Sequence, residues 1–220
     1  QPFLQHKLPD IIRQILRKSC CVVAPSKKIQ DYLIGVGLTT PIKLIPNGID
    51  LSKFYDPSPK TSDEIHSFRK LYFINDTDKV IVFVGRLATE KNINILLQNF
   101  KQILEIRPDT TLLLIGDGMD RRALQTYTAE LGIENKVIFT GYLRWPDQIQ
   151  TAYKASDLFM SASHSEVHPI TFIEAMAAGL PIVAADDESI SDMVKNGVNG
   201  WAIKNDKELW DKAVKVLEND

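Results

Sequence analysis

The 220-residue sequence predicts an α/β protein with a Rossmann-like parallel sheet that helices cover on both faces. Two observations lead to this prediction. From Lys79 onward, short β-rich runs alternate with amphipathic stretches of helical period. The β-rich runs are almost continuously apolar, which is typical of parallel strands buried on both faces. Because ligands of such sheets bind at the carboxyl ends of the strands, the loops that follow the strands are the places to search for a site.

The first fifty residues form a separate unit. In chain order we expect a short amphipathic helix over 9–18, a buried strand in CCVVAP at 20–25, a helix from its cap Ser26 to about Ile34, a strand within 39–54 and an Asn47-Gly48 turn. The polar stretch 56–67 is expected to be a surface loop. Cys20 and Cys21 would point to opposite faces of their strand, so we expect no bond between them. Buried, reduced thiols favour a cytoplasmic protein.

Six strands and six helices are expected after residue 79. The strands are expected at 80–85, 111–116, 136–141, 158–163, 181–185 and, with the weakest pattern, 200–203. The helices are expected at about 92–105, 119–131, 145–155, 169–178, 188–195 and 206–218. Pro169 suits a first helical turn, and Gly179 followed by Pro181 suits a helix end.

The composition, with 44% hydrophobic and 25% charged residues, is ordinary for a soluble globular protein. A net charge of -2 argues against nucleic acid as a partner. No Cys/His spacing indicates a metal site, and no apolar run reaches membrane-spanning length. Up to Lys53, however, eight Lys and Arg residues stand against three Asp residues. We interpret this basic start as a solvated helix face, and contact with an anionic membrane at its inner face is the second interpretation.

The first candidate site is VGRLATEKN at 84–92. Gly85 ends a strand, and Arg86 and Lys91 flank a loop that opens a helix near Asn92. Two cations beside the free N–H groups of a helix N-terminus form an anion site suited to phosphate. The opposing interpretation is a solvated charged loop.

The second candidate is the Gly-Asp-Gly turn at 116–118. It is not a dinucleotide fingerprint, because Arg121 stands where the last glycine would be. We expect a tight turn that lets the backbone approach a neighbouring group.

The third and strongest candidate spans 163–187. Glu174 lies in an otherwise apolar helix, so some group should satisfy its carboxylate. Glu166 precedes this helix at the ligand-binding edge of the sheet, and the free N–H groups near Ile170 and Thr171 could meet a phosphate between the two carboxylates. The opposing interpretation is a capped core helix with one paired glutamate.

At this point the sequence resembles the retaining glycosyltransferases of family GT4, which have the two-domain GT-B fold. Glu166 and Glu174 match the E-x7-E motif of that family, and the other matching elements are APSKKIQDYL, IPNGID, VGRLATEKN, LLLIGDG, VIFTGYL and ASDLFMSAS. By this resemblance, residues 1–24 are the end of an N-terminal acceptor domain and residues 25–220 are the C-terminal, nucleotide-sugar-binding domain. Since Gln1 is not a natural start, we expect the chain to be part of a longer enzyme and to transfer no sugar alone.

The resemblance also implies roles for single residues. Arg86 and Lys91 would hold the diphosphate of a nucleotide-sugar donor, Glu174 the ribose, and Glu166 the transferred hexose. The loop from Tyr142 through Leu143 to Arg144 would lie near the base. The donor is a substrate, with a UDP-sugar such as UDP-glucose expected first, and no cofactor is expected.

Two departures from the family pattern concern the acceptor and the donor. Val167-His168-Pro169 replaces Gly-Phe-Gly of many relatives, so His168 could donate to the sugar or phosphate or only fill a turn. Asp186-Asp187-Glu188-Ser189 replaces their paired glycines, in a combination similar to bacterial glycosyltransferases that glucosylate diacylglycerol. A lipid or a glycan is therefore the expected acceptor.

Three other functions compete with this one. A glycosidase would use Glu166 and Glu174 as acid and base, but it leaves the Arg86/Lys91 loop without a purpose. A nucleotide-sugar epimerase does not explain the E-x7-E spacing. A non-catalytic module that only binds a nucleotide sugar agrees with all the motifs, and an assay of the longer protein would distinguish it.

Overall fold

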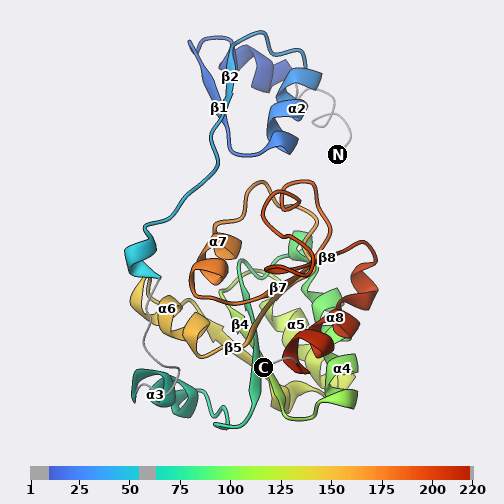
Figure 1. Cartoon of the computed structure of the whole chain (residues 1–220). Helices are drawn as coiled ribbons and strands as arrows, with labels where there is room; N and C mark the ends of the chain where they lie inside the picture. The colour runs from blue at the N-terminus through green and yellow to red at the C-terminus, as the bar shows by residue number, and fades with distance from the viewer. Residues whose placement is uncertain (1–9, 55–62, 219–220) are drawn as a thin grey trace.

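The computed structural model describes residues 10–54 and 63–218, and its larger unit is built on one six-stranded sheet (Figure 1). The strands are β3 (Lys79–Val84), β4 (Thr110–Ile115), β5 (Val137–Gly141), β6 (Leu158–Ser161), β7 (Ile182–Ala185) and β8 (Gly200–Ile203). All six are parallel and lie in the order β5-β4-β3-β6-β7-β8. The predicted Rossmann-like sheet is confirmed.

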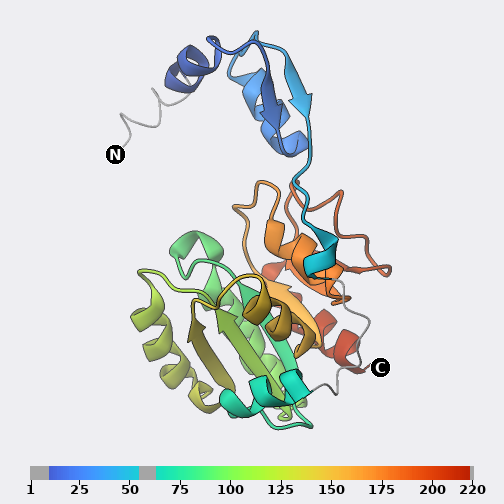
Figure 2. The same cartoon turned by 90° about the vertical axis from the view of Figure 1, so that its left-hand side faces the viewer.

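Helices cover the sheet on both faces because consecutive strand residues point to opposite sides. In β3, Ile81 and Phe83 pack with one group of helices, and Val80 and Val82 pack with the other. The first group consists of α4 (Ile93–Ile106), α5 (Arg121–Leu131) and α8 (Leu209–Glu218). The second group consists of α3 (Asp63–Leu71), α6 (Asp147–Lys154) and α7 (Ile170–Ala177). Figure 2 shows these layers from the side.

Helix α3 corrects one prediction, because residues 63–67 were expected to belong to a loop. The segment buries Ile65 and Phe68, three positions apart, against the second helical layer. Acidic residues in its first turn and basic residues in its last turn also suit the helix dipole. Its polar composition concealed this narrow apolar stripe. Residues 56–62 of the expected loop lie outside the described residues.

The prediction of a helix over 188–195 is wrong, since this segment forms turns instead. Asp187 accepts hydrogen bonds from the main-chain N and the hydroxyl of Ser189, at 2.8 and 2.6 Å. Asn199 likewise accepts from the main-chain N of Lys195 at 2.7 Å. Short polar side chains that bind nearby backbone groups compete with helix formation, and here they determine the chain path.

The first fifty residues form a small unit of their own. A helical segment over 10–16 precedes β1 (Val22–Ala24), α2 (Lys27–Gly35) and β2 (Ile42–Leu44). The two strands pair in parallel, separately from the main sheet, around a core of Val22, Leu33 and Leu38. Figures 1 and 2 show this unit standing apart from the main sheet, joined by an extended segment that leads to the 3-10 helix η1 (Leu51–Lys53).

Two expectations within this unit are wrong. Both cysteines precede β1, with Cys20 exposed and Cys21 half-buried, so they are not part of a buried strand. Ser26 occupies the position before α2, but its hydroxyl makes no capping bond and is buried without a hydrogen-bond partner among the described residues. Within residues 10–54 and 63–218, no helix combines the length and the hydropathy needed to cross a bilayer.

Candidate functional site

The candidate site lies where the strand order of the sheet reverses. The chain runs from β3 outward to β4 and β5, and then returns to place β6 on the other side of β3. The loop after β3 therefore leads to α4 on one face, and the loop after β6 leads to α7 on the other. Such a reversal opens a crevice at the carboxyl ends of the two central strands, which is the usual ligand site of open α/β sheets.

Two glycines of the Gly-Asp-Gly turn hold the loop after β3 in place. A Cβ on Gly116, whose φ is +124°, would lie 2.0 Å from the carbonyl oxygen of Gly85. A Cβ on Gly118 would lie 2.1 Å from the carbonyl oxygen of Leu87. The expected tight turn is therefore present, and the group that it approaches is the chain itself. Only glycine permits this contact without displacement of the backbone.

Lys91 and Glu166 meet in the crevice. The Lys91 Nζ lies 2.8 Å from Glu166 Oε1, and the two side chains are only 19% and 12% exposed. Asn92, which has a φ of +49° before α4, donates its amide to the carbonyl of Ala162 at 3.2 Å. Ser165 donates its hydroxyl to the carbonyl of Glu90 at 3.0 Å. Three contacts thus join the loop after β3 to the loop after β6.

Arg86 belongs to the same loop but points toward solvent. Its side chain is 69% exposed and forms an ion pair with Glu90, four residues later. The described contacts do not join it to Lys91 or Glu166. The two cations are five positions apart in one loop, and the fold leaves Lys91 mostly buried and Arg86 exposed.

Glu174 is buried in α7, and both of its carboxylate oxygens have partners. Oε2 accepts from the Tyr153 hydroxyl at 3.0 Å, and Oε1 accepts from the Trp145 indole N–H at 3.4 Å. Burial raises the pKa of Glu174, and these two hydrogen bonds offset part of that effect. The pKa of Tyr153 is raised well above its usual value, by burial first and then by the Glu174 charge. The partners that the sequence required for Glu174 are therefore Tyr153 and Trp145.

Sequence reasoning did not identify either partner. Tyr153 lies on the buried side of α6, where a tyrosine is most simply interpreted as core. Trp145 directly follows the segment Tyr142–Arg144 that was expected near a base, and this position was the available signal. Within that segment, Tyr142 is 79% exposed and Leu143 packs against the core.

The start of α7 completes the site. Ile170 and Thr171 occupy its first turn, where main-chain N–H groups have no partner within the helix. Ile170 is 46% exposed. The His168 Nδ1 is buried without a hydrogen-bond partner among the described residues, and its main-chain carbonyl accepts from the Asn47 amide at 2.9 Å. His168 therefore lies directly before α7 with one ring nitrogen unsatisfied among the described residues.

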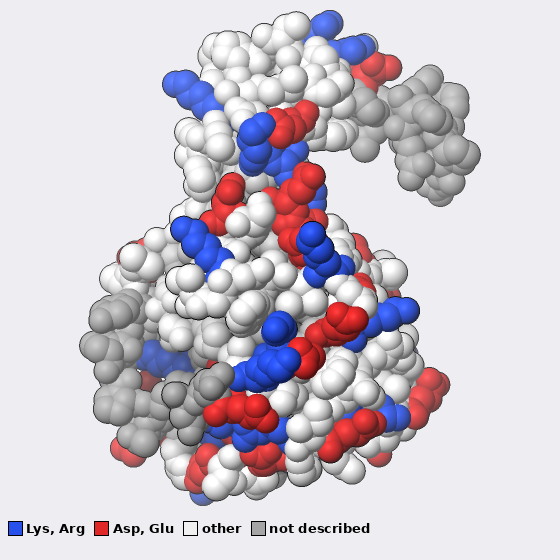
Figure 3. Space-filling view, turned by 45° about the vertical axis from the view of Figure 1, so that its right-hand side comes forward, with Lys and Arg blue, Asp and Glu red and all other residues white. Residues whose placement is uncertain are grey.

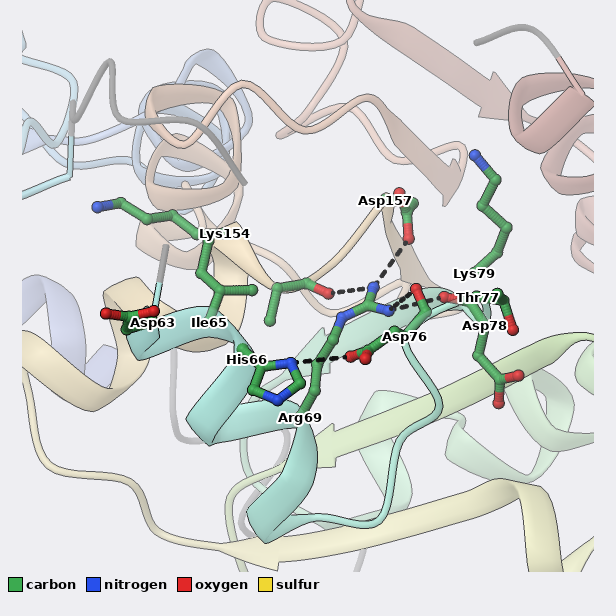
Figure 4. Close-up of a pocket in the computed structure, with 11 residues that line it drawn as sticks. Asp63, Ile65, His66, Arg69, Asp76, Thr77, Asp78, Lys79, Lys154 and Asp157 are labelled. Atoms are coloured by element: carbon green, nitrogen blue, oxygen red, sulfur yellow. Dashed lines mark hydrogen bonds and ion pairs between the residues drawn. The ribbon is translucent and has the colours of Figure 1, made fainter. Parts of the chain in front are cut away.

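A pocket of about 610 Å³ lies at the opposite end of the sheet, near the start of β3 and before β6 (Figure 4). The guanidinium of Arg69 donates there to the carbonyls of Asn75, Asp76 and Asp78 at 3.0 to 3.1 Å. It also donates to the carbonyl of Ala155 at 3.0 Å. Arg69 therefore holds chain segments together, and we do not assign this pocket as the candidate site.

Two family models match the chain. The model described as "Glycosyl transferases group 1" matches residues 64–220, and the model described as "Glycosyltransferase Family 4" matches residues 1–53. The first match covers most of the chain, including every candidate site residue. The chain belongs to the group 1 glycosyltransferases. The expected GT4 relationship and the assignment of the sheet to one half of a GT-B fold are confirmed.

Relatives of this glycosyltransferase chain include enzymes that act on lipids. The alpha-monoglucosyldiacylglycerol synthase of Acholeplasma laidlawii is 28% identical over 99% of this chain and 54% of its own length. The enzyme of the same name from Streptococcus pneumoniae is 30% identical over 86% of this chain and 43% of its own length. The chain thus spans about half the length of these curated relatives. The expected similarity to bacterial glycosyltransferases of this kind is therefore confirmed over the chain as a whole.

A solved structure is also similar. Anabaena HepE in complex with UDP and glucose superposes with a TM-score of 0.85 at 26% identity, over 96% of this chain and 57% of that chain. The match therefore extends over both the small unit and the main sheet. Among the described residues, no group of three or more His, Cys, Asp or Glu side chains could hold a metal ion.

Proposed function

We propose that this chain is the donor-binding half of a retaining glycosyltransferase. In this proposal the donor is a UDP-sugar, with UDP-glucose first, and the transferred hexose goes to a lipid or glycan acceptor. The proposal is supported by relatives named as monoglucosyldiacylglycerol synthases and by a similar structure that holds UDP and glucose. The same proposal places the protein in the cytoplasm, with its basic small unit against an anionic membrane.

The Lys91–Glu166 pair at the strand-order reversal is the single observation on which the proposal depends. A mostly buried ammonium that contacts the loop leading into α7 suits a diphosphate, because this cation and the free N–H groups at the start of α7 would attract the same anion. In the absence of donor, Glu166 neutralises Lys91. When a diphosphate replaces it, the Glu166 carboxylate becomes available to hydroxyl groups of the sugar.

The remaining residues extend this site along the donor. Glu174 would accept from the ribose hydroxyls, with Trp145 giving way to them, and Tyr142 and Leu143 would border the base. Arg86 would turn from Glu90 toward the diphosphate. Cations at the diphosphate stabilise the charge that develops on the leaving group, without a metal bound to the protein.

We also propose a different domain boundary from the one expected at residue 24. A division there separates β1 from β2, although these strands pair with each other. A boundary in the extended segment between β2 and η1 keeps them together. By this proposal the small unit belongs to the acceptor half, and the described chain lacks most of the groups that would face an acceptor.

Binding measurements test the donor assignment. Calorimetric titrations with UDP, GDP and ADP, and then with UDP-glucose, should give the tightest binding for the uridine ligands. A ligand at a hundred times its dissociation constant should also stabilise the fold by about 2.7 kcal/mol in thermal unfolding. Equal, weak binding of all three nucleotides would contradict the proposal. A nucleotide-sugar sensor would bind the donor but show no transfer in the longer protein.

A further inference from the structure

Two side chains of the small unit hold the loop that carries Glu166. The Lys28 Nζ, on α2, donates to the main-chain carbonyl of Glu166 at 3.1 Å. The Asn47 amide donates to the main-chain carbonyl of His168 at 2.9 Å. These contacts connect residues 138 and 121 positions apart, and no feature of the local sequence indicates them. Figure 3 shows basic and acidic side chains gathered where the small unit meets the larger one.

Lys28 also binds the loop after β7. Its Nζ lies 2.8 and 2.7 Å from the two carboxylate oxygens of Asp187. The Asp187 side chain is 8% exposed and the Lys28 side chain 30% exposed, so water screens this pair less than a surface pair. Burial alone would raise the pKa of Asp187, but the bonds from Lys28 and Ser189 outweigh it and lower the pKa. Asp187 is one of the residues that replace the paired glycines of many relatives.

The loop over 162–169 is therefore held from two sides. On the side of the main sheet, Lys91 binds the Glu166 carboxylate and Ser165 binds the carbonyl of Glu90. On the side of the small unit, Lys28 and Asn47 bind the carbonyls of Glu166 and His168. With its main chain on this path, the Glu166 carboxylate lies 2.8 Å from the Lys91 Nζ.

We infer that Lys28 and Asn47 are positioning residues, through which docking of the small unit sets the path of loop 162–169 and so places the Glu166 carboxylate in the donor site. This inference rests on the proposed function for its meaning in catalysis, but the geometry that it describes exists without a donor. The same inference gives a role to Asp187, whose carboxylate binds the Lys28 ammonium. It also makes the sugar end of the site sensitive to the position of the acceptor half.

Amide hydrogen exchange on the ligand-free chain tests the inference directly. In Lys28→Met, peptides that cover 162–169 and 186–192 should exchange roughly ten- to a hundredfold faster, the effect of losing a hydrogen bond to a charged group. Lys28→Arg should stay close to the parent chain. Lys27→Met is the matched control, because Lys27 is the neighbouring residue on α2 and its ion pair among the described residues is with exposed Asp31.

Asn47→Ala gives a second, independent test of the same loop. It should speed exchange in 162–169 but leave 186–192 unchanged, because the hydrogen bond that Asn47 makes among the described residues goes to the main-chain carbonyl of His168. Unchanged exchange in 162–169 in both variants would overturn the inference. So would an increase spread equally over α4 and α5, because that would show general destabilisation.

A binding experiment then separates this inference from the proposed function. If the parent chain binds UDP-glucose, Lys28→Met should lower the affinity for UDP-glucose relative to UDP by about fivefold, because Glu166 faces the sugar. An unchanged ratio would overturn the link to the sugar end of the site. If the parent chain binds neither ligand, the proposed function fails, and the exchange results still decide whether Lys28 and Asn47 position the loop.

Discussion

At the scale of single residues, the site is defined by which charges are buried together. Lys91 and Glu166 are mostly buried and paired, whereas Arg86 and Glu90 are paired at the surface. Exposed ion pairs add little to the free energy of unfolding and exchange partners easily, whereas a buried charge that loses its partner strongly destabilises the fold. We therefore expect Lys91 to be the principal phosphate ligand and Arg86 to contribute only after it leaves Glu90.

Replacement of Lys91 tests this ranking. Lys91→Met should weaken UDP binding by about 1.5–3 kcal/mol, the range for hydrogen bonds to charged groups. Lys70→Met, an exposed lysine at the end of α3, is the control and should leave UDP affinity unchanged. Calorimetric titration with UDP measures both. Unchanged UDP affinity in both Lys91→Met and Arg86→Ala would refute the diphosphate assignment.

Replacement of each of the two glutamates should change ligand binding in a different way. Glu166→Gln should weaken UDP-glucose binding and transfer more than UDP binding, because its partner is the sugar. Glu174→Gln should weaken UDP binding itself, by about 1–2 kcal/mol for lost ribose hydrogen bonds. Titrations with both ligands distinguish the variants. An equal loss of UDP affinity in the two would end this division of roles.

The raised pKa of Glu174 makes a separate prediction for stability. A carboxyl whose pKa is higher in the folded chain than in the unfolded chain binds more protons when folded. The contribution of this carboxyl to the free energy of unfolding is fully present below the ordinary glutamate pKa of about 4.5. It is lost as the pH rises through the folded-state pKa. In chemical unfolding experiments from pH 4 upward, the free energy of unfolding of the parent chain should therefore fall relative to that of Glu174→Gln. The slope is set by the difference in bound protons between the folded and unfolded chains, which is at most about one. A difference between the two proteins that does not change with pH would contradict it.

At the scale of elements, the loops after the strands are shaped by contacts between neighbouring chain segments. The turn at 116–118 presses against the backbone after β3, and turns stabilised by Asp187 and Asn199 replace an expected helix. The α3 helix, in contrast, lies at the opposite end of the sheet, which it covers with Ile65 and Phe68 and where its Arg69 binds main-chain carbonyls.

A single methyl group should test the close approach at the turn over 116–118. Gly116→Ala should lower the free energy of unfolding by about 2–4 kcal/mol, because the new Cβ adds overpacking to the strain of positive φ. Gly132→Ala is the matched control, since Gly132 has a φ of +70° but no atom within 4 Å of an added Cβ. It should cost only about 1 kcal/mol. Urea denaturation measures both, and equal losses would show that the close contact is unimportant.

At the scale of the whole molecule, the chain consists of a six-stranded sheet, which we propose to bind the donor, and a small unit that reaches onto its carboxyl edge through Lys28 and Asn47. In the proposed enzyme the attacking hydroxyl would be oriented mainly by the rest of the acceptor half. Orientation of the reacting groups can contribute about 7–11 kcal/mol to lowering a barrier. A chain that holds the donor alone does not have this contribution.

We therefore expect this chain to bind UDP-glucose without transferring glucose, and the longer protein to transfer it with retention of configuration. Incubation of each with UDP-glucose and diacylglycerol, followed by NMR of the product anomer, measures both properties. Transfer by the isolated chain would refute the first expectation. An inverted anomer from the longer protein would refute the second.

The sequence by itself determined the strands, most helices and the family, because apolar periodicity and motifs act over a few neighbouring residues. It also identified Lys91, Glu166 and Glu174 as candidates, although their roles stay predictions. It missed α3, whose apolar stripe is only two residues wide, and it expected a helix over 188–195, where side-chain bonds to the backbone prevail. Only the tertiary structure decided that the strand order reverses between β3 and β6.

The same limit applies to the partners within the site. The pairing of Lys91 with Glu166, of Glu174 with Tyr153, and of Lys28 with Asp187 joins residues 75, 21 and 159 positions apart. No local pattern encodes such pairs, since each depends on where the packed sheet and its loops bring distant residues together. The chemistry of the residues was therefore visible in the sequence, while their partners and their burial were set by packing.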